Sequence, residues 1–342
     1  MSQCPFCNTA MAADIAAAGA ASLSVCEACF NPVFGPGSGA DGGMQAVAGA
    51  RDMRQVAAPG SMAGALLEQV FGAMEQLPVL PDVSQRILRL LKDPEFGMAE
   101  LAVMVREDPV LAVAIMKQAN SVAFGGLHPM KDLNSACSRL GMKTVANTVQ
   151  MVANRNLFIT GDARLKSDME RLWRHSVAAA HCANQIARMT LAPNPEMLFL
   201  AGLIHDIGKV ILLDMIASPR AKVLRGLEGN PDLVREVLDS LHPLFGLLVC
   251  QAWRLPMELR AAVYFHHHPE RCPAGDWPAF AHTVALANTI ARIEGYGMYP
   301  EPAEAFLASD PSSISLGLSD IKLATLRVDF SDDLESLFEV AG

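Results

Sequence analysis

Residues 200–209 read Leu-Ala-Gly-Leu-Ile-His-Asp-Ile-Gly-Lys, an apolar segment that contains an adjacent imidazole and carboxylate. Burying His205 and Asp206 costs free energy unless a metal ion, a carboxylate or a phosphate satisfies them. Successive helix residues point about 100° apart, so these two side chains can share one site. Gly208 lets a second helix approach closely or ends the turn, and Lys209 adds a cation. His205, Asp206 and Lys209 are therefore the candidate catalytic residues.

More histidines surround this segment. An isolated His-Asp pair is more often a core histidine bonded to a neighbour, but here His175 precedes the pair and other histidines follow it. This order resembles the ligand order of the HD superfamily of metal-dependent phosphohydrolases. The resemblance implies an iron or manganese site built from six residues: His175, His205, Asp206, His242, His266 and His267.

Composition limits the classes of function. The chain has 342 residues, of which 51% are hydrophobic, enough for the core of one large domain or two smaller ones. Its net charge of -9 argues against binding to a nucleic-acid backbone, which relies on Lys and Arg. The first residues have no charged region followed by an apolar core, and charges interrupt the apolar stretch at 197–217. We therefore expect a cytoplasmic protein with no membrane segment.

The N-terminal segment contains two C-x-x-C pairs, formed by Cys4 with Cys7 and by Cys26 with Cys29. Four thiolates at this spacing predict a tetrahedral Zn²⁺ site. A segment this short cannot bury a core, so its folding would depend on the metal. Residues 1–30 resemble a zinc ribbon, and a redox role is less favoured. We expect the remaining cysteines to be reduced and apolar in character: Cys137, Cys182, Cys250 and Cys272.

Helix signals dominate the rest of the chain. Asp108-Pro109 and Asn194-Pro195 each place a capping side chain before a proline suited to the first helical turn. Apolar residues recur at three and four positions, and alternating β-branched runs between tight turns are absent. The sequence therefore predicts an all-α body.

The expected organisation has four parts. The zinc-ribbon-like module is followed by a flexible, glycine-rich linker at 31–61 and by the helical body at 62–295. The acidic C-terminal extension at 296–342 carries an apolar stripe, and we expect a helix that packs weakly on the body.

The helical body resembles the HDOD family, relatives of the HD phosphohydrolases in bacterial signalling proteins. The motifs that carry this resemblance are Leu77-Pro78-Val79-Leu80-Pro81, Asp108-Pro109-Val110-Leu111, Ala119-Asn120-Ser121, Leu140-Gly141-Met142, Trp173-Arg174-His175-Ser176, Trp253-Arg254-Leu255-Pro256 and His266-His267-His268-Pro269. The resemblance implies a bundle of two packed helical lobes, at about 70–155 and 165–295, and a protein partner in a signalling pathway.

Three departures bear on catalysis. Asn288 stands where HD phosphohydrolases carry a late Asp, and an amide is a weaker metal ligand than a carboxylate. Arg171 stands where some HD-GYP phosphodiesterases carry an acidic ligand, and Gly275-Asp276-Trp277-Pro278 replaces their Gly-Tyr-Pro motif. These departures favour a vestigial cluster, metal-free or weakly loaded, over a bound metal with slow or no turnover and over a competent phosphohydrolase.

Two functions therefore stay open. The favoured one is a non-catalytic scaffold for interaction or ligand sensing, with a zinc-binding module at its N-terminus. The other is a metal-dependent phosphohydrolase or phosphodiesterase acting on a nucleotide.

Overall fold

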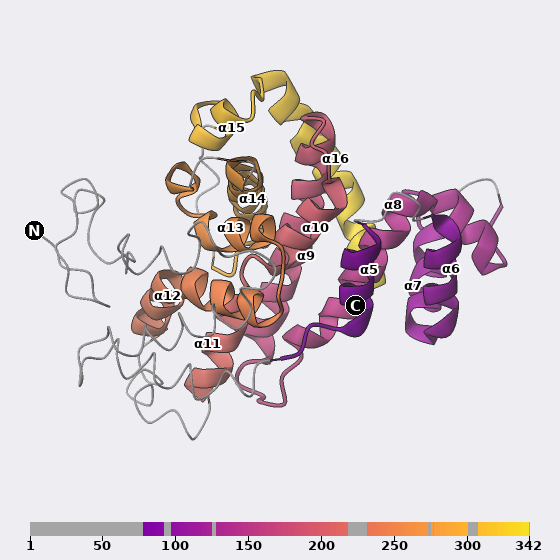
Figure 1. The fold of residues 1–342 in the computed structure, drawn as a ribbon, viewed down its shortest axis with the longest axis horizontal. Coiled ribbons are helices and arrows are strands. Elements are labelled where there is room, and N and C mark those ends of the chain that lie inside the picture. Colours follow the sequence, from indigo (N-terminus) through magenta and orange to yellow (C-terminus); the bar gives the residue numbers. More distant parts are fainter. Residues whose placement is uncertain are drawn as a thin grey trace, which may run out of the picture. The chain divides into compact units, whose positions relative to one another are not determined.

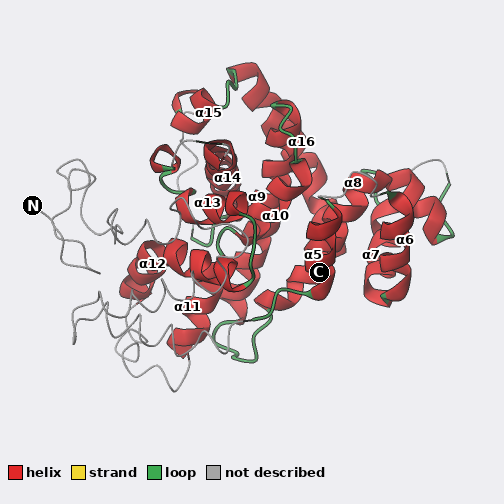
Figure 2. Cartoon of the chain, in the orientation of Figure 1, coloured by secondary structure: helices red, strands yellow, loops and turns green. Residues whose placement is uncertain are grey.

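The computed structural model describes residues 78–91, 97–124, 128–217, 231–272, 275, 277–299 and 307–341. Within these ranges the regular structure is helical and no strand occurs (Figure 2). The predicted all-α fold is confirmed for this part of the chain. The predicted zinc site at Cys4, Cys7, Cys26 and Cys29, with its ribbon and linker, lies outside the described residues. No described helix has both the length and the apolar character that a bilayer-spanning segment needs.

The described part of the chain divides into two compact units. The described residues of Val79–Asp206 and Pro256–Gly342 form the larger unit, and Pro78 with the described residues of Ile207–Leu255 form the smaller one. The larger unit contains α5 (Asp82–Leu90), α6 (Met98–Glu107), α7 (Pro109–Ala119), α8 (Leu133–Asn154), η3 (Arg155–Phe158), α9 (Lys166–Met189), α10 (Pro195–Ile204), α13 (Met257–Phe265), η4 (Pro269–Arg271), α14 (Trp277–Ala291), η5 (Arg292–Tyr296), η6 (Leu307–Ser309), α15 (Pro311–Ser315) and α16 (Asp320–Ala341). The smaller unit contains α11 (Ile207–Ala217) and α12 (Pro231–Ala252).

The predicted helix starts occur at Asp108-Pro109 and Asn194-Pro195. The Asp108 carboxylate accepts hydrogen bonds from the Val110 and Leu111 amides, at 2.8 and 3.3 Å, and α7 begins at Pro109. This arrangement satisfies amides that the first turn leaves unbonded. Helix α10 begins at Pro195, but the Asn194 side chain makes no capping bond.

Helices α5 to α8 enclose one core of the larger unit (Figure 1). Fully buried side chains from the different helices meet there, among them Ile87, Leu101, Ile115 and Val149. At the end of α7, Asn120 uses its side-chain amide to bind both backbone groups of Met130. This contact ties the end of α7 to the segment that precedes α8.

Helix α9 lies at the centre of the second group of helices in this unit. It packs against α10, α14 and α16, and its buried Trp173 ring lies 5.1 Å from the Phe158 ring. Because α9 carries His175 and α10 leads into His205, their packing brings the first two predicted ligands to one place.

The C-terminal helix α16 differs from the sequence-based expectation. It packs against α9, α7 and α8, and the side chains of Phe330 and Leu334 are fully buried. The expectation of weak packing is wrong because the apolar stripe, spaced at three and four residues, outweighs the acidic charge of the segment. The stripe comprises Leu323, Leu326, Phe330, Leu334 and Leu337.

In the smaller unit, α11 packs against α12 at very short range. A Cβ atom added to Gly208 would lie 2.0 Å from the His242 carbonyl oxygen and 2.7 Å from the Gly246 nitrogen. Only glycine fits such a contact. The close helix approach expected at Gly208 is therefore present.

Candidate metal centre

His205 and Asp206 lie at the short break between α10 and α11. His205 follows the last residue of α10, and both side chains have 0% exposed surface. Every residue of α10 is buried, so the pair emerges from an apolar helix into the protein interior. A carboxylate in such a place needs a positive charge or strong hydrogen bonds to remain ionised.

Three imidazole rings surround the Asp206 carboxylate within the larger unit. The Nε2 atoms of His175, His205 and His266 lie 3.5, 3.6 and 3.7 Å from its oxygens. The His205 ring also makes edge contacts with the other two rings, at centroid distances of 5.0 Å each. Four of the six predicted metal ligands are therefore within one buried cluster, which we call the Asp206 cluster.

Each imidazole of the Asp206 cluster is fixed through its other nitrogen. The Nδ1 atom of His205 donates to the Gly202 carbonyl at 2.7 Å, and that of His266 donates to Val263 at 2.8 Å. The Nδ1 atom of His175 donates to the Tyr296 carbonyl at 3.1 Å. A carbonyl oxygen can only accept, so the proton of each neutral ring is on Nδ1. The three Nε2 atoms then face Asp206 as lone-pair donors.

This arrangement suits a cation. The Nε2 atoms of His175 and His205 are 3.1 Å apart, too close for two facing lone pairs with nothing positive between them. The candidate ligand atoms of His175, His205 and Asp206 all lie within 4.8 Å of one another. Imidazole nitrogens and a carboxylate oxygen suit Fe, Mn or Zn ions. Backbone carbonyls on the outer nitrogens are the usual supports of metal-binding histidines. The residues present therefore fit a divalent metal ion.

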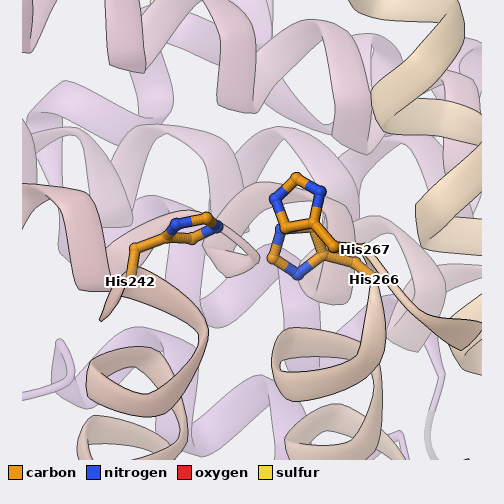
Figure 3. Close-up of side chains that lie close together, drawn as sticks. All are labelled: His242, His266 and His267. Carbon is orange, nitrogen blue, oxygen red and sulfur yellow. The ribbon is translucent and has the colours of Figure 1, made fainter. Parts of the chain in front are cut away.

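Two other predicted ligands have different surroundings. His267 follows His266 directly after α13, and the centroids of the two rings, drawn in Figure 3, are 4.1 Å apart. The side chain of His267 is exposed. His242, on α12, belongs to the smaller unit, where its buried ring donates from Nδ1 to the Leu238 carbonyl at 2.7 Å. His242 thus has the same outer support as the cluster histidines.

Lys209, the third catalytic candidate, and the two departures Asn288 and Arg171 differ in burial. Lys209, on α11 of the smaller unit, has 9% exposed surface, which is unusual for lysine. Asn288 is buried on α14. Arg171 is largely exposed and lies 3.8 Å from Asp168 on its own helix. An exposed arginine in an ion pair with its own helix is not a metal ligand.

Sequence reasoning missed Tyr296. Its carbonyl, not its side chain, supports His175, and any residue has a carbonyl. The sequence signal nearest to it is Gly295, because a glycine often marks the end of a helix. In the structure Gly295 has a φ of 87°, outside the helical range.

Of the other cysteines, Cys137, Cys182 and Cys250 are buried and Cys272 is partly buried, and none of the four forms a disulfide with another described cysteine. Burial raises the pKa of Cys182 strongly and that of Cys272 to about 12. Such thiols stay protonated at neutral pH and are poor nucleophiles. The apolar role expected for them fits this result.

Comparison with known proteins identifies the family. The HDOD domain model matches residues 77–269. A crystal structure of an HDOD domain protein of unknown function from Geobacter sulfurreducens has a TM-score of 0.62 and 24% identity, and the match covers 80% of this chain and 99% of that chain. At this identity the likeness shows a common fold.

Two curated proteins also match. An uncharacterized protein of Treponema pallidum is 25% identical over 255 residues, which are 71% of this chain and 48% of that protein. A cyclic di-GMP phosphodiesterase of Pseudomonas aeruginosa is 33% identical over 132 residues, which are 38% of this chain and 30% of that protein. The chain thus spans less than half the length of these relatives. The family model, in contrast, covers more than half of the chain, which therefore belongs to the HDOD domain family.

Proposed function

We propose that this protein is a bacterial signalling protein whose HDOD domain is a non-catalytic, ligand-sensing scaffold. The ligand of the Asp206 cluster is a divalent cation, and the output is contact with a protein partner. Family membership and the buried cluster support this proposal.

One observation carries the proposal. The Asp206 cluster supplies three imidazole nitrogens and a single carboxylate, and the side chains of His175, His205, Asp206 and His266 have 2% exposed surface or less. Four protein ligands close a tetrahedral metal site, whereas catalytic sites keep a position open for water or substrate. A bound cation would offset the negative charge of Asp206. The three histidines would be held ready by their carbonyl partners, so binding needs little rearrangement of the side chains.

The position of Asn288 also argues against hydrolysis. Two-metal phosphoester hydrolysis needs carboxylates to hold both cations and a bridging water. Asp206 is the one carboxylate of the cluster, and the residue at the place of a late acidic ligand is a neutral amide. The chain can therefore hold a cation more readily than it can activate water.

Other parts of the proposal rest on sequence alone. Cys4, Cys7, Cys26 and Cys29 are proposed to bind Zn²⁺ in a separate N-terminal module that recognises a partner. The proposed location is the cytoplasm. The domain boundaries at 30, 61 and 295 remain predictions.

A phosphohydrolase acting on a nucleotide is the second candidate. The observation that favours it is the Asp206 cluster itself, together with the matching cyclic di-GMP phosphodiesterase of Pseudomonas aeruginosa. On this alternative Lys209 stays a candidate catalytic residue, as the sequence predicts.

Turnover by metal-loaded protein separates the two candidates. The full chain would be loaded with Mn²⁺ or Fe²⁺ and incubated with cyclic di-GMP and with bis(p-nitrophenyl) phosphate. The scaffold proposal predicts retained metal and no hydrolysis above that of the Asp206→Asn variant. Hydrolysis that depends on Asp206 would overturn the proposal in favour of the enzyme.

A further inference from the structure

The support of His175 differs from that of the other two histidines in the Asp206 cluster. His205 and His266 each bond to a carbonyl three residues earlier, within the same turn of chain. His175 bonds to Tyr296, which lies 121 residues later. The orientations of His205 and His266 are thus set locally, whereas that of His175 depends on a tertiary contact.

Tyr296 is held in place by α16. The Tyr296 ring lies 6.0 Å from the Phe330 ring and 5.4 Å from the Phe338 ring, measured between centroids. Two residues earlier, Glu294 accepts a hydrogen bond from Arg327 of α16 at 2.5 Å. Gly295, between them, adopts a φ of 87°, which other residues rarely adopt. The η5 turn is therefore fixed from one side by α16.

Helix α16 also contacts α9 next to His175. The Arg174 guanidinium lies over the Phe338 ring, 4.1 Å from its centroid. Phe338 thus contacts both the residue next to His175 and the residue whose carbonyl supports it. Both of these supporting residues, Tyr296 and Phe338, lie beyond residue 269, where the match to the family model ends.

We propose that Tyr296, held by α16, is a positioning residue that fixes the tautomer of His175 and thereby the cation affinity of the Asp206 cluster. With the carbonyl in place, the proton stays on Nδ1 and Nε2 is a ligand. When the carbonyl moves away, the proton can occupy either nitrogen and the ring can turn. Docking of α16 and binding of the cation are then coupled, and the coupling acts in both directions. The cation-binding half of this inference rests on the proposed function.

Phe338→Ala tests the coupling, with Val328→Ala as the matched control. Val328 lies on the same helix with 62% of its surface exposed. Loss of such an outer support typically weakens metal binding about 10- to 100-fold. We expect that loss in Mn²⁺ affinity for Phe338→Ala and none for Val328→Ala, by calorimetric titration of the full chain.

A second variant keeps the test valid if Phe338→Ala fails to fold. Arg327→Gln removes the bond to Glu294 from a side chain with 45% exposed surface. It should keep the wild-type helix content and still weaken Mn²⁺ binding, by less than Phe338→Ala does.

NMR of the histidine ring nitrogens in metal-free protein provides a readout that does not need the cation. The His175 signals are assigned by comparison with His175→Gln. Wild type should show His175 protonated at Nδ1, and Phe338→Ala should show a mixture of tautomers. An unchanged tautomer in both Phe338→Ala and Arg327→Gln would overturn the inference. Absence of Mn²⁺ binding by wild type with the expected tautomers would instead contradict the proposed function and the cation-binding half of the inference, and would leave the positioning of His175 by Tyr296 in place.

Discussion

The Nε2 atoms of His175 and His205 face each other at 3.1 Å, while each ring donates its Nδ1 proton to a backbone carbonyl. Two neutral imidazoles in this arrangement repel each other through their lone pairs. The Asp206 carboxyl group lies in the same buried space, with an oxygen 3.5 Å from the His175 Nε2 and 3.6 Å from the His205 Nε2. A divalent cation between these atoms would offset the repulsion and stabilise the ionised form of Asp206, which supports the proposed cation site.

Asp206→Asn should abolish most of the cation affinity without unfolding the protein. The amide has nearly the shape of the carboxylate but lacks its charge, so it is a poor ligand. We expect at least about a 10-fold rise in the dissociation constant for Mn²⁺, measured by calorimetry. Glu270→Gln is the matched control, because that carboxylate is exposed and pairs with His268. Equal Mn²⁺ affinity in both variants would show that Asp206 is not a ligand.

Gly208→Ala should destabilise the protein strongly. The new methyl group would collide with the His242 carbonyl oxygen at 2.0 Å and would push α11 and α12 apart. Overpacking of this kind costs about 1–3 kcal/mol or more. Urea denaturation followed by circular dichroism measures the loss.

Gly161→Ala is the control for that variant, since a Cβ at Gly161 meets no atom within 4 Å. Its unfolding free energy should stay within about 0.5 kcal/mol of wild type. Comparable unfolding free energies for the two variants would contradict the close helix contact at Gly208.

Phe330→Ala should cost about 3–5 kcal/mol of unfolding free energy, because its side chain is fully buried between α16 and the helices it packs on. Val328→Ala removes an exposed side chain of the same helix and should change stability by less than about 0.5 kcal/mol. Thermal denaturation of both variants tests this difference. A small effect of Phe330→Ala would mean that α16 does pack weakly, as the sequence first suggested.

His181 should make stability depend on pH. Burial, assisted by the charge of Arg188, lowers the pKa of His181 from 6.5 to about 4. The unfolded state therefore binds the proton more tightly, and stability falls as the pH drops from about 6.5 towards 4. The unfolding free energy should therefore be about 3 kcal/mol higher above pH 6.5, where His181 is neutral in both states, than below pH 4.

Replacing His181 with Leu should flatten this part of the pH profile, measured by urea denaturation in the presence of a chelator. His268→Gln is the control, since that histidine is partly exposed and pairs with Glu270. Profiles of the same slope for wild type and His181→Leu would exclude His181 as the titrating group.

Much of the fold follows from local signals in the sequence. Asp108-Pro109 predicts the start of α7 because a capping carboxylate and a proline both suit a first helical turn. The close helix approach at Gly208 could be anticipated because Gly208 stands in an otherwise apolar, helical stretch. These are properties of a few neighbouring residues.

The docking of α16 was harder to predict from sequence. Its acidic residues suggested a solvated helix, and the apolar stripe alone did not say which helices it would cover. The contact of Phe330 and Phe338 with Tyr296 joins residues that no short motif connects.

The Asp206 cluster was also predictable only in part. The order of His175, His205, Asp206 and His266 pointed to four residues that the structure does bring together. Sequence could not reveal the carbonyl of Tyr296, because a backbone group has no signature of its own. The binding of a metal by these residues stays a prediction.

Metal content is the most direct test of the central claim. The full chain would be expressed in medium with added iron and manganese, and elemental analysis would compare it with the His205→Ala/Asp206→Asn double variant. The cysteine pairs are identical in both proteins, so any zinc held there cancels in the comparison. We predict that wild type carries about one more divalent ion per chain than the double variant, with equal helix content in both. The same metal content in the two folded proteins would contradict the assignment of a cation to this cluster.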